Sequence, residues 1–240
     1  MNDGGGKSYN KAEYVCRMFA SIARRYDLLN AVLSFGQDRR WRRFAIAQID
    51  GIPNQVILDL ATGTGKIAAL AARCYSGSTV VGVDFCSEML AVARDKAKAE
   101  SLECKVMLVQ GDALRLPFPD NTFDCITIGF ALRNVTSVAS LFTEMARVTK
   151  PGGKMVSLEL TRPSLKILGP LHKLYIRVII RLVGGIVSGK WDAYAYLPQS
   201  ILEFPSPNEV QKVMEGVGWR GVETNRLTFG AATVQTGIKG

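Results

Sequence analysis

A chain of 240 residues is long enough to bury a full hydrophobic core, and its composition is that of an ordinary globular protein. Hydrophobic residues make up 48% of it and charged residues 21%, which excludes extended disorder and fibrous repeats. The five cysteines show no paired ligand spacing, and His172 is the one histidine, so we expect a reducing compartment and no metal site. No run of about 18 apolar residues occurs, and we therefore expect no membrane span.

The net charge of +9 is distributed unevenly along the chain. Residues 1–50 carry nine Lys/Arg and five Asp/Glu, residues 51–160 carry eleven of each, and residues 161–240 carry ten and five. The central part is thus neutral, and the excess lies towards both ends. Such a pattern is compatible with nucleic-acid binding and with attachment to an anionic membrane surface.

Residues 9–49 are expected to form helices ahead of a sheet. Apolar and aromatic residues recur at every fourth position from Tyr14 to Tyr26, and a second helical segment follows Gly36. These segments predict a helical cap at the N-terminal end.

Short apolar segments rich in β-branched residues then alternate with helix-compatible sequence. The first five expected strands are residues 56–60, 79–83, 105–109, 125–128 and 154–158. Continuous apolar strands of this kind predict a parallel sheet that is covered on both faces. Helices are expected at 86–100, with Ser87 as N-cap, and at 137–149.

A helix at 208–217 is followed by two more expected strands, at 221–225 and 231–236. The link between these strands is short, which predicts that the last strand runs antiparallel. The fold class is therefore α/β, with a seven-stranded and mostly parallel sheet.

No repeat or low-complexity linker interrupts the chain, so we expect a single domain over 1–240. Its parts are a helical cap at 1–50, a core at 51–160, an insertion at 161–200, and a C-terminal helix and strands at 201–240. The stretch 164–196 is too long for an ordinary connection, and we expect it to be a lid.

A glycine-rich turn follows the first expected strand. Gly63 and Gly65 stand between strand and helix, where the backbone comes close to a ligand. Together with Ala68 and with Asp84 after the second strand, the turn matches the dinucleotide-binding fingerprint. A nicotinamide-dependent enzyme is therefore an open alternative at this point.

Carboxylates stand at the ends of three expected strands: Asp59, Asp84 and Asp112. A carboxylate such as Asp59 would repel a pyrophosphate, whereas the ammonium and sulfonium of S-adenosylmethionine tolerate it. Asp84 can accept hydrogen bonds from both ribose hydroxyls, and Asp112 can accept one from an adenine amino group. These three residues favour S-adenosylmethionine as the cofactor.

Longer motifs carry a resemblance to a known family. Four of them resemble class I S-adenosylmethionine-dependent methyltransferases: Leu58–Gly65, Val83–Asp84, Gly111–Ala113 and Lys150–Gly153. The run Leu116–Val135 resembles the ubiquinone/menaquinone biosynthesis C-methyltransferase family, and so do motifs within Tyr26–Arg42 and Tyr196–Ile201. The resemblance extends from about Phe19 to Gly237 and implies a Rossmann-like methyltransferase fold.

The resemblance implies an enzyme that transfers a methyl group from S-adenosylmethionine to the ring of a prenylated quinol. The substrate would be a demethylmenaquinol, a demethylphylloquinol or a ubiquinol precursor. The resemblance carries the catalytic role over to Arg133, Asn134 and Tyr26. We prefer Arg133 as the electrostatic partner of the phenolate over a literal base, because a guanidinium scarcely deprotonates.

The residues expected to bind the cofactor are Asp59, Gly63, Thr64, Gly65, Asp84, Asp112, Ala113 and Gly129. The chain departs from the usual family pattern at Lys66, Asp38, Gly129 and Ala131, where the family usually has Asp, His, Ser and Gly. These departures bear on the identity of the quinol more than on the chemistry.

A prenylated quinol resides in the bilayer, so the resemblance favours a peripheral membrane protein in the cytoplasm, or on the stroma or matrix side of an organelle. In the insertion, Lys173, Arg177 and Arg181 fall on one face of an amphipathic segment that would contact anionic lipid. The alternative for this segment is a core-packed helix with a solvated face.

Other functions remain open. The acceptor can be another small aromatic or lipid molecule, or the chain can be a non-catalytic, cofactor-binding subunit of a quinone-synthesis complex. A homodimer is a further alternative to a complex. Nucleic acid is not expected as a partner, because no Asn/Asp-Pro-Pro-aromatic motif follows the fourth strand. Ring type and prenyl length stay undetermined.

Overall fold

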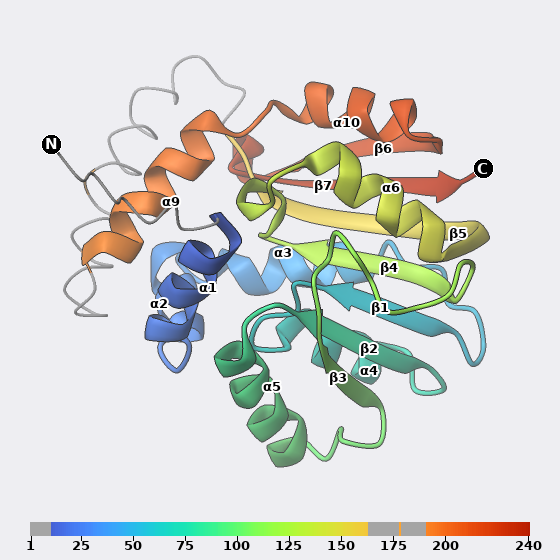
Figure 1. Ribbon diagram of the computed structural model, residues 1–240, viewed down its shortest axis with the longest axis horizontal. Coiled ribbons are helices and arrows are strands. Elements are labelled where there is room, and N and C mark those ends of the chain that lie inside the picture. The colour runs from blue at the N-terminus through green and yellow to red at the C-terminus, as the bar shows by residue number, and fades with distance from the viewer. Residues whose placement is uncertain (1–10, 163–177, 179–190) are drawn as a thin grey trace, which may run out of the picture.

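Seven strands form one sheet in the computed structural model, which describes residues 11–162, Val178 and residues 191–240 (Figure 1). The strands are β1 (Val56–Leu60), β2 (Thr79–Asp84), β3 (Val106–Gln110), β4 (Phe123–Gly129), β5 (Thr149–Leu160), β6 (Trp219–Leu227) and β7 (Ala232–Lys239). All seven were expected from the sequence: β1 has the predicted boundaries, β3 and β7 begin one residue later than predicted, and the other four strands are longer than predicted.

The strand order is β3-β2-β1-β4-β5-β7-β6. Strands β1 to β5 pair in parallel, and β7 runs antiparallel to both β5 and β6. The prediction of a mostly parallel sheet with an antiparallel last strand is confirmed. The order reverses between β1 and β4, and in sheets of this type ligands bind at the carboxyl ends of the strands near that reversal.

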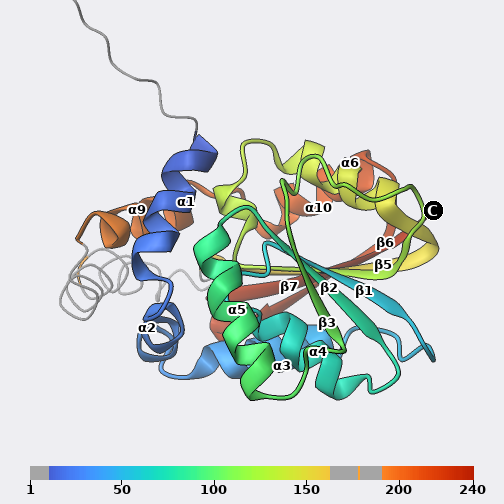
Figure 2. The same ribbon diagram turned by 60° about the horizontal axis from the view of Figure 1, so that its bottom comes forward.

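Helices cover both faces of the sheet (Figure 2). One face is covered by α3 (Gln37–Ile46), α4 (Lys66–Cys74) and α5 (Ser87–Ala99), and the other by α6 (Val138–Val148) and α10 (Pro207–Gly216). The α10 helix begins at a capping box, in which Ser206 and Glu209 each bond the other's backbone amide. Ser137 caps α6 by accepting a hydrogen bond from the amide of Ser140 at 3.1 Å.

The cap expected at the start of α5 is wrong. Cys86 rather than Ser87 is the N-cap, and no side chain of the cap residue bonds the helix. Instead, the Asp84 carboxylate accepts a hydrogen bond from the amide of Cys86 at 2.9 Å. The carboxylate that ends β2 therefore also fixes the start of the next helix.

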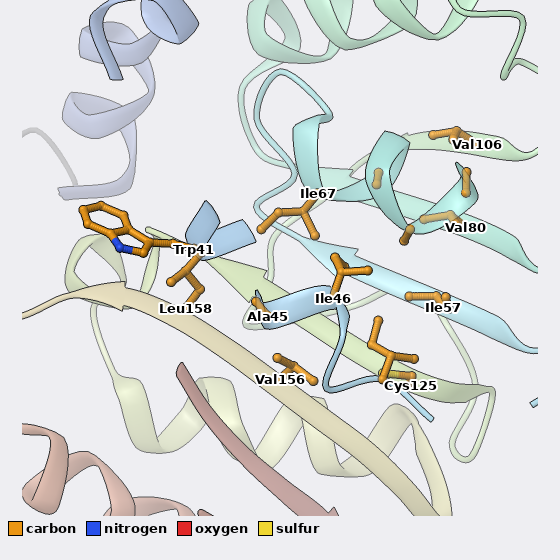
Figure 3. Close-up of a cluster of buried hydrophobic side chains, with 14 of the residues drawn as sticks. Trp41, Ala45, Ile46, Ile57, Ile67, Val80, Val106, Cys125, Val156 and Leu158 are labelled. Atoms are coloured by element: carbon orange, nitrogen blue, oxygen red, sulfur yellow. The ribbon is translucent and has the colours of Figure 1, made fainter. Parts of the chain in front are cut away.

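Figure 3 shows a cluster of buried hydrophobic side chains in which residues of α3 pack against the sheet. Trp41, Ala45 and Ile46 are buried against residues of β1 and β5 such as Ile57 and Val156. Burying one large apolar side chain contributes about 1.5–3 kcal/mol. This packing attaches the N-terminal region firmly to the sheet.

Three further helices lie beyond the carboxyl ends of the parallel strands (Figure 1): α1 (Lys11–Ile22), α2 (Tyr26–Leu33) and α9 (Trp191–Glu203). The periodicity predicted one helix through Tyr26, but α1 ends at Ile22 and Tyr26 begins α2. Ala23, in the turn between them, is buried with Cys86 and Met89. The chain turns at this contact, and the sequence has no glycine or proline there to mark the turn.

Most of the expected lid, including Lys173, Arg177 and Arg181, lies outside the described residues. Within the part of the chain that is described, no helix combines the length and the apolar character needed to cross a membrane.

Candidate active site

Two cavities of about 210 Å³ each lie at the carboxyl ends of the strands. One, the apolar cavity, is lined mainly by α1, α2, α3 and α9. The other, the acidic cavity, is lined by the turns that follow β1, β2, β3 and β4. Both are lined by Phe19, Tyr26, Phe130 and Asn134, so these four side chains form a common wall.

The acidic cavity holds five of the eight residues expected to bind the cofactor: Gly63, Asp84, Asp112, Ala113 and Gly129. The Asp84 carboxylate accepts a hydrogen bond from the amide of Gly63 at 2.7 Å, which ties the end of β2 to the glycine turn. Burial raises the pKa of Asp84. Asp112 is exposed and accepts a hydrogen bond from the amide of Leu114 at 2.9 Å.

Left-handed backbone conformations shape the walls of this cavity. Gly63 has a φ of +58°, and a Cβ at this position would lie 3.3 Å from Cε of Met89. Two residues with side chains, Ala61 and Phe130, also have positive φ values, of 48° and 59°, and both line the cavity. Such strained positions concentrate at functional sites.

The other three residues expected to bind the cofactor lie elsewhere. Asp59 is buried inside β1, where its carboxylate accepts hydrogen bonds from the hydroxyls of Thr62 at 2.6 Å and Thr127 at 2.7 Å. Thr64 donates its hydroxyl to Asp27 at 2.8 Å, and with Gly65 it lines a third cavity on the side of α3. Among the described lining residues of the acidic cavity, none of these three occurs.

The acidic cavity fits S-adenosylmethionine better than a dinucleotide. Asp84 and Asp112 offer carboxylates to hydroxyl and amino groups, and the described lining residues include no Lys or Arg that would hold a pyrophosphate. The glycine turn leaves room for close approach of a ligand to the backbone. We therefore expect Asp84, Asp112 and the Gly63 turn to hold the cofactor.

Asp59 gives the site a pH-dependent effect on stability. Burial raises the pKa of Asp59 to about 6, from 3.8. Because the folded state holds this proton more tightly than the unfolded state does, the residue destabilises the fold progressively as the pH rises from about 4 to 6. We expect Asp59→Asn to be more stable than the wild type at pH 8, by up to about 3 kcal/mol, and nearly equal to it at pH 4.

Denaturant unfolding at the two pH values measures this difference, and Asp124→Asn is the control of opposite sign. Burial alone would raise the pKa of Asp124, but hydrogen bonds from Lys150 and from the amide of Val56 outweigh it and lower the pKa. The Asp124→Asn variant should therefore lose more stability at pH 8 than at pH 4. An Asp59→Asn variant that is less stable than the wild type at pH 8 would contradict the conclusion that the buried Asp59 carboxylate destabilises the fold at this pH.

The three predicted catalytic residues lie together around the apolar cavity. Tyr26 and Asn134 belong to the common wall. Arg133 lines the apolar cavity but not the acidic cavity. Arg133 forms a buried ion pair with Glu159 in β5, and Glu159 also accepts a hydrogen bond from the amide of Leu160 at 2.8 Å. The structure thus combines an ion-pair role for Arg133 with a place in the cavity.

Two residues that hold the predicted catalytic side chains, Tyr196 and Glu159, were missed as site residues. Tyr196 donates its hydroxyl to Oδ1 of Asn134 at 3.2 Å, and burial raises the pKa of this tyrosine. Tyr196 stood in a motif that resembles the family, but its pairing with Asn134 joins residues 62 positions apart, and that of Glu159 with Arg133 joins residues 26 positions apart. Spacing within one element cannot predict such contacts.

Two departures from the family pattern contact each other. Lys66 lies 3.5 Å from the carboxylate of Asp38, which also pairs with Arg42. Burial would raise the pKa of Asp38, but Arg42 and Lys66 outweigh it and lower the pKa. Asp38 lines the apolar cavity and is the one carboxylate among its described lining residues.

One group of potential metal ligands gathers among the described residues, at Cys16, Cys86 and Glu88, whose ligand atoms lie within 4.8 Å of one another. Burial raises the pKa of the Cys86 thiol to about 12. Because a thiolate rather than a thiol binds metal, this environment favours a packed thiol. Cys86 instead packs with Ala23 and Met89.

The model of the ubiE/COQ5 methyltransferase family matches residues 7–239 of the chain. A protein of Geotalea daltonii named ubiquinone/menaquinone biosynthesis C-methyltransferase UbiE is 43% identical over 97% of this chain and 99% of its own length. A demethylmenaquinone methyltransferase of Thermus thermophilus is 44% identical over 92% of this chain and 99% of its own length.

Solved structures with little sequence similarity share the fold. A SAM-dependent methyltransferase from Aquifex aeolicus has a TM-score of 0.64 at 18% identity, covering 91% of this chain and 97% of its own. The [4+2]-cyclase SpnF has a TM-score of 0.71 at 15% identity, covering 95% and 96%. The similarity to a cyclase shows that the fold alone does not determine the reaction.

The sequence matches extend over nearly the whole chain, and the acidic cavity suits a cationic cofactor with hydroxyl and amino groups. The protein is a methyltransferase, and its methyl donor is S-adenosylmethionine. The chain belongs to the ubiE/COQ5 methyltransferase family.

Proposed function

We propose that the protein methylates a ring carbon of a prenylated demethylquinol in quinone biosynthesis. The observation that carries this proposal is the common wall of the two cavities, where Tyr26, Phe130 and Asn134 line both. A quinol ring in the apolar cavity and the cofactor in the acidic cavity would meet at this wall. The names of the relatives from Geotalea daltonii and Thermus thermophilus support the substrate class.

The reaction needs a nucleophilic ring carbon and a methyl group in line with it. When bound, S-adenosylmethionine supplies an activated methyl group on a sulfonium. The chain's own task is largely positioning, because holding two reactants in the reactive orientation removes much of the entropic barrier. Tyr26, Phe130 and Asn134 would orient the ring, and Asp84 and the Gly63 turn would hold the donor.

The phenolic oxygen would lose its proton to water so that negative charge reaches the adjacent carbon, and after methylation that carbon would lose its own proton to water, which restores the aromatic ring. Arg133 lines the apolar cavity, and its charge would stabilise the phenolate that forms. Glu159 holds Arg133 in place. Asn134, which is fixed by Tyr196, offers an amide to the same oxygen directly or through a water molecule.

Mass spectrometry of the quinone pool in cells that lack the protein tests this proposal. A demethyl quinone should accumulate, and its mass would identify both the ring and the prenyl chain. An unchanged quinone pool would favour the alternative of another small aromatic or lipid acceptor.

Asp84 should contribute directly to cofactor affinity. We expect Asp84→Ala to weaken S-adenosylmethionine binding by about 1–3 kcal/mol, because the variant loses acceptors for the ligand and the hydrogen bond to the amide of Gly63. Calorimetry measures the change. Asp95→Ala, at an exposed position of α5, is the control and should bind normally. Binding of NADH instead of S-adenosylmethionine would contradict the assignment of the acidic cavity.

The proposed substrate also places the protein at a membrane surface, because a polyprenyl tail keeps the quinol in the bilayer. The positive charge carried by residues 1–50 and 161–240 is consistent with anionic lipid as a partner. We propose peripheral attachment from the side on which the quinol is synthesised.

A further inference from the structure

Two side-chain amides that line the apolar cavity have no hydrogen-bond partner among the residues that the structure describes. Nδ2 of Asn30 is buried without an acceptor. The amide of Gln37, a half-buried residue at the start of α3, makes no hydrogen bond within the same set of residues. Buried polar groups almost always have a partner, because an unpaired group gives up its bonds to water without replacement. A ligand that enters the cavity can supply the missing partner.

The amides of Asn30 and Gln37 differ in this respect from other polar side chains around them. Several polar side chains that line the same cavity already bond to the protein: Ser34, Asp38, Thr161, Tyr196 and Thr228. Their hydrogen-bonding groups serve to hold the cavity together. The two amides are therefore the groups to examine for contact with a substrate.

Both amides lie in the part of the apolar cavity that is remote from the acidic cavity. Tyr26 lines both cavities, whereas Asn30, one helical turn later on α2, lines only the apolar cavity. This turn moves the side chain about 6 Å along the helix axis. Gln37 also lines only the apolar cavity. A ring whose reacting carbon meets the methyl donor at the common wall would thus have its far side towards these amides.

A quinol ring carries two hydroxyls across the ring from each other, and only one of them is adjacent to the reacting carbon. Arg133 and Asn134, in the short helix η1 (Leu132–Asn134) after β4, would act on that adjacent oxygen. The second hydroxyl needs a partner from another element. A phenolic hydroxyl both donates and accepts, and so does an amide. The broad χ2 torsion of asparagine allows the amide of Asn30 to turn its nitrogen towards such a ligand.

We propose that Asn30 and Gln37 bind the second hydroxyl of the quinol, across the ring from the reacting phenolate, and so select acceptors with two ring oxygens over monophenols. A site built to bond a hydroxyl rejects the analogue that lacks it, because the polar groups of the site are then left unpaired. The inference rests on the proposed function, since it assigns the orientation of that substrate.

Steady-state kinetics with two acceptors test the proposal: a short-chain demethylquinol, and the same ring without the hydroxyl across from the phenolate. Asn30→Leu keeps the branched shape of the side chain and removes its amide. We expect this variant to raise KM for the quinol about tenfold and to change kcat less than about threefold, because the lost bond is present in the ground state and the transition state alike. Its KM for the monophenol should not rise.

Gln37→Met removes the second amide and should show the same pattern. Where the monophenol is not methylated, its inhibition constant against the quinol takes the place of KM. The matched control is Leu28→Gln, at a position of α2 that is 58% exposed and is not among the described lining residues of the cavity. The control should keep the wild-type KM for both acceptors. A control that raises KM for the quinol as much as Asn30→Leu does would overturn the proposal.

Thermal unfolding without ligand separates substrate binding from a structural role. Asn30→Leu should unfold at the wild-type temperature or above it, because the substitution removes a buried donor that has no described partner. Asn30→Ala adds no volume and favours the helix, so it repeats the test if leucine disturbs the packing. If both variants unfold well below the wild type, Asn30 holds the fold through a partner of its own, and the proposal is wrong.

The kinetic outcomes also distinguish this inference from the proposed function. If the wild type methylates the quinol and either Asn30→Leu or Gln37→Met keeps the wild-type preference for quinol over monophenol, the inference fails while the proposed function stands. If the variants lower kcat equally on both acceptors, the amides act on the reacting oxygen and the assignment is wrong. If the wild type methylates neither acceptor, the proposed function itself is wrong.

Discussion

Arg133→Ala is expected to lower kcat on a demethylquinol by about 10²–10³-fold, the usual loss when a group that stabilises developing negative charge is removed. Arg133 lines the apolar cavity and not the acidic one, so the affinity for S-adenosylmethionine should stay nearly unchanged. The same substitution leaves Glu159 buried without its cation, which costs about 3–5 kcal/mol of stability. Steady-state kinetics, calorimetry and thermal unfolding of the variant measure the three quantities.

A second variant separates the loss of activity from the loss of stability. Arg133→Met/Glu159→Gln removes both charges and keeps the approximate volume, so it should recover most of the stability while remaining as slow as Arg133→Ala. Arg133→Lys keeps the charge but not the planar guanidinium, and should be intermediate. A stable double variant with wild-type kcat would remove Arg133 from the mechanism.

Gly63→Val is expected to abolish cofactor binding. The new side chain would start 3.3 Å from Met89, within the wall of the acidic cavity, at a φ of +58° that a β-branched residue tolerates poorly. The side chain would also displace the backbone that Asp84 holds through the amide of Gly63. We expect at least a 100-fold loss of affinity for S-adenosylmethionine, or roughly 3 kcal/mol, by calorimetry.

Gly152→Val is the matched control for backbone strain. Gly152 has a φ of +75°, and nothing lies within 4 Å of a Cβ built at this position. The control should lose a similar amount of stability while still binding the cofactor. Equal loss of binding in both variants would show that general destabilisation, and not the cavity wall, explains the Gly63 result.

The strands of the sheet could be predicted because each is marked by a contiguous segment of the sequence. Strands β1 to β4 are short apolar segments and β5 contains one at 154–158, while Asp84 ends β2 and the glycine turn follows β1 in the sequence. Since the carboxyl ends of parallel strands meet at one edge, their end residues could be expected to gather there. Gly63, Asp84, Asp112, Ala113 and Gly129 do line one cavity.

The pairings inside the site were not predictable, because they depend on how distant elements pack. Asp59 looked like a ligand-facing carboxylate, but two threonine hydroxyls occupy its oxygens within the sheet. Thr64 turns towards Asp27 of α2, an element that had been expected to continue α1. Predicting one helix where the structure has two, α1 and α2, therefore changes which side chains are expected to line each cavity.

The position of α2 also depends on packing between elements that are distant in the sequence. The periodicity from Tyr14 to Tyr26 described a single helix, whereas the break after Ile22 lets Tyr26 line both cavities and leaves Leu28 and Val32 exposed. At this break Ala23 is buried in one hydrophobic cluster with Cys86 and Met89, residues far from it in the chain. Local sequence carries no signal for it.

The central claim is that the common wall of the two cavities brings a quinol ring carbon to the methyl donor. The most direct test incubates the purified protein with S-adenosylmethionine labelled with deuterium in its methyl group and with short-chain demethylbenzoquinol or demethylnaphthoquinol, followed by mass spectrometry and NMR of the product. We predict that the label appears on a ring carbon of at least one of the two quinols, at a rate that Arg133→Met/Glu159→Gln reduces strongly. Label on a phenolic oxygen, or no transfer to either quinol, would contradict the account.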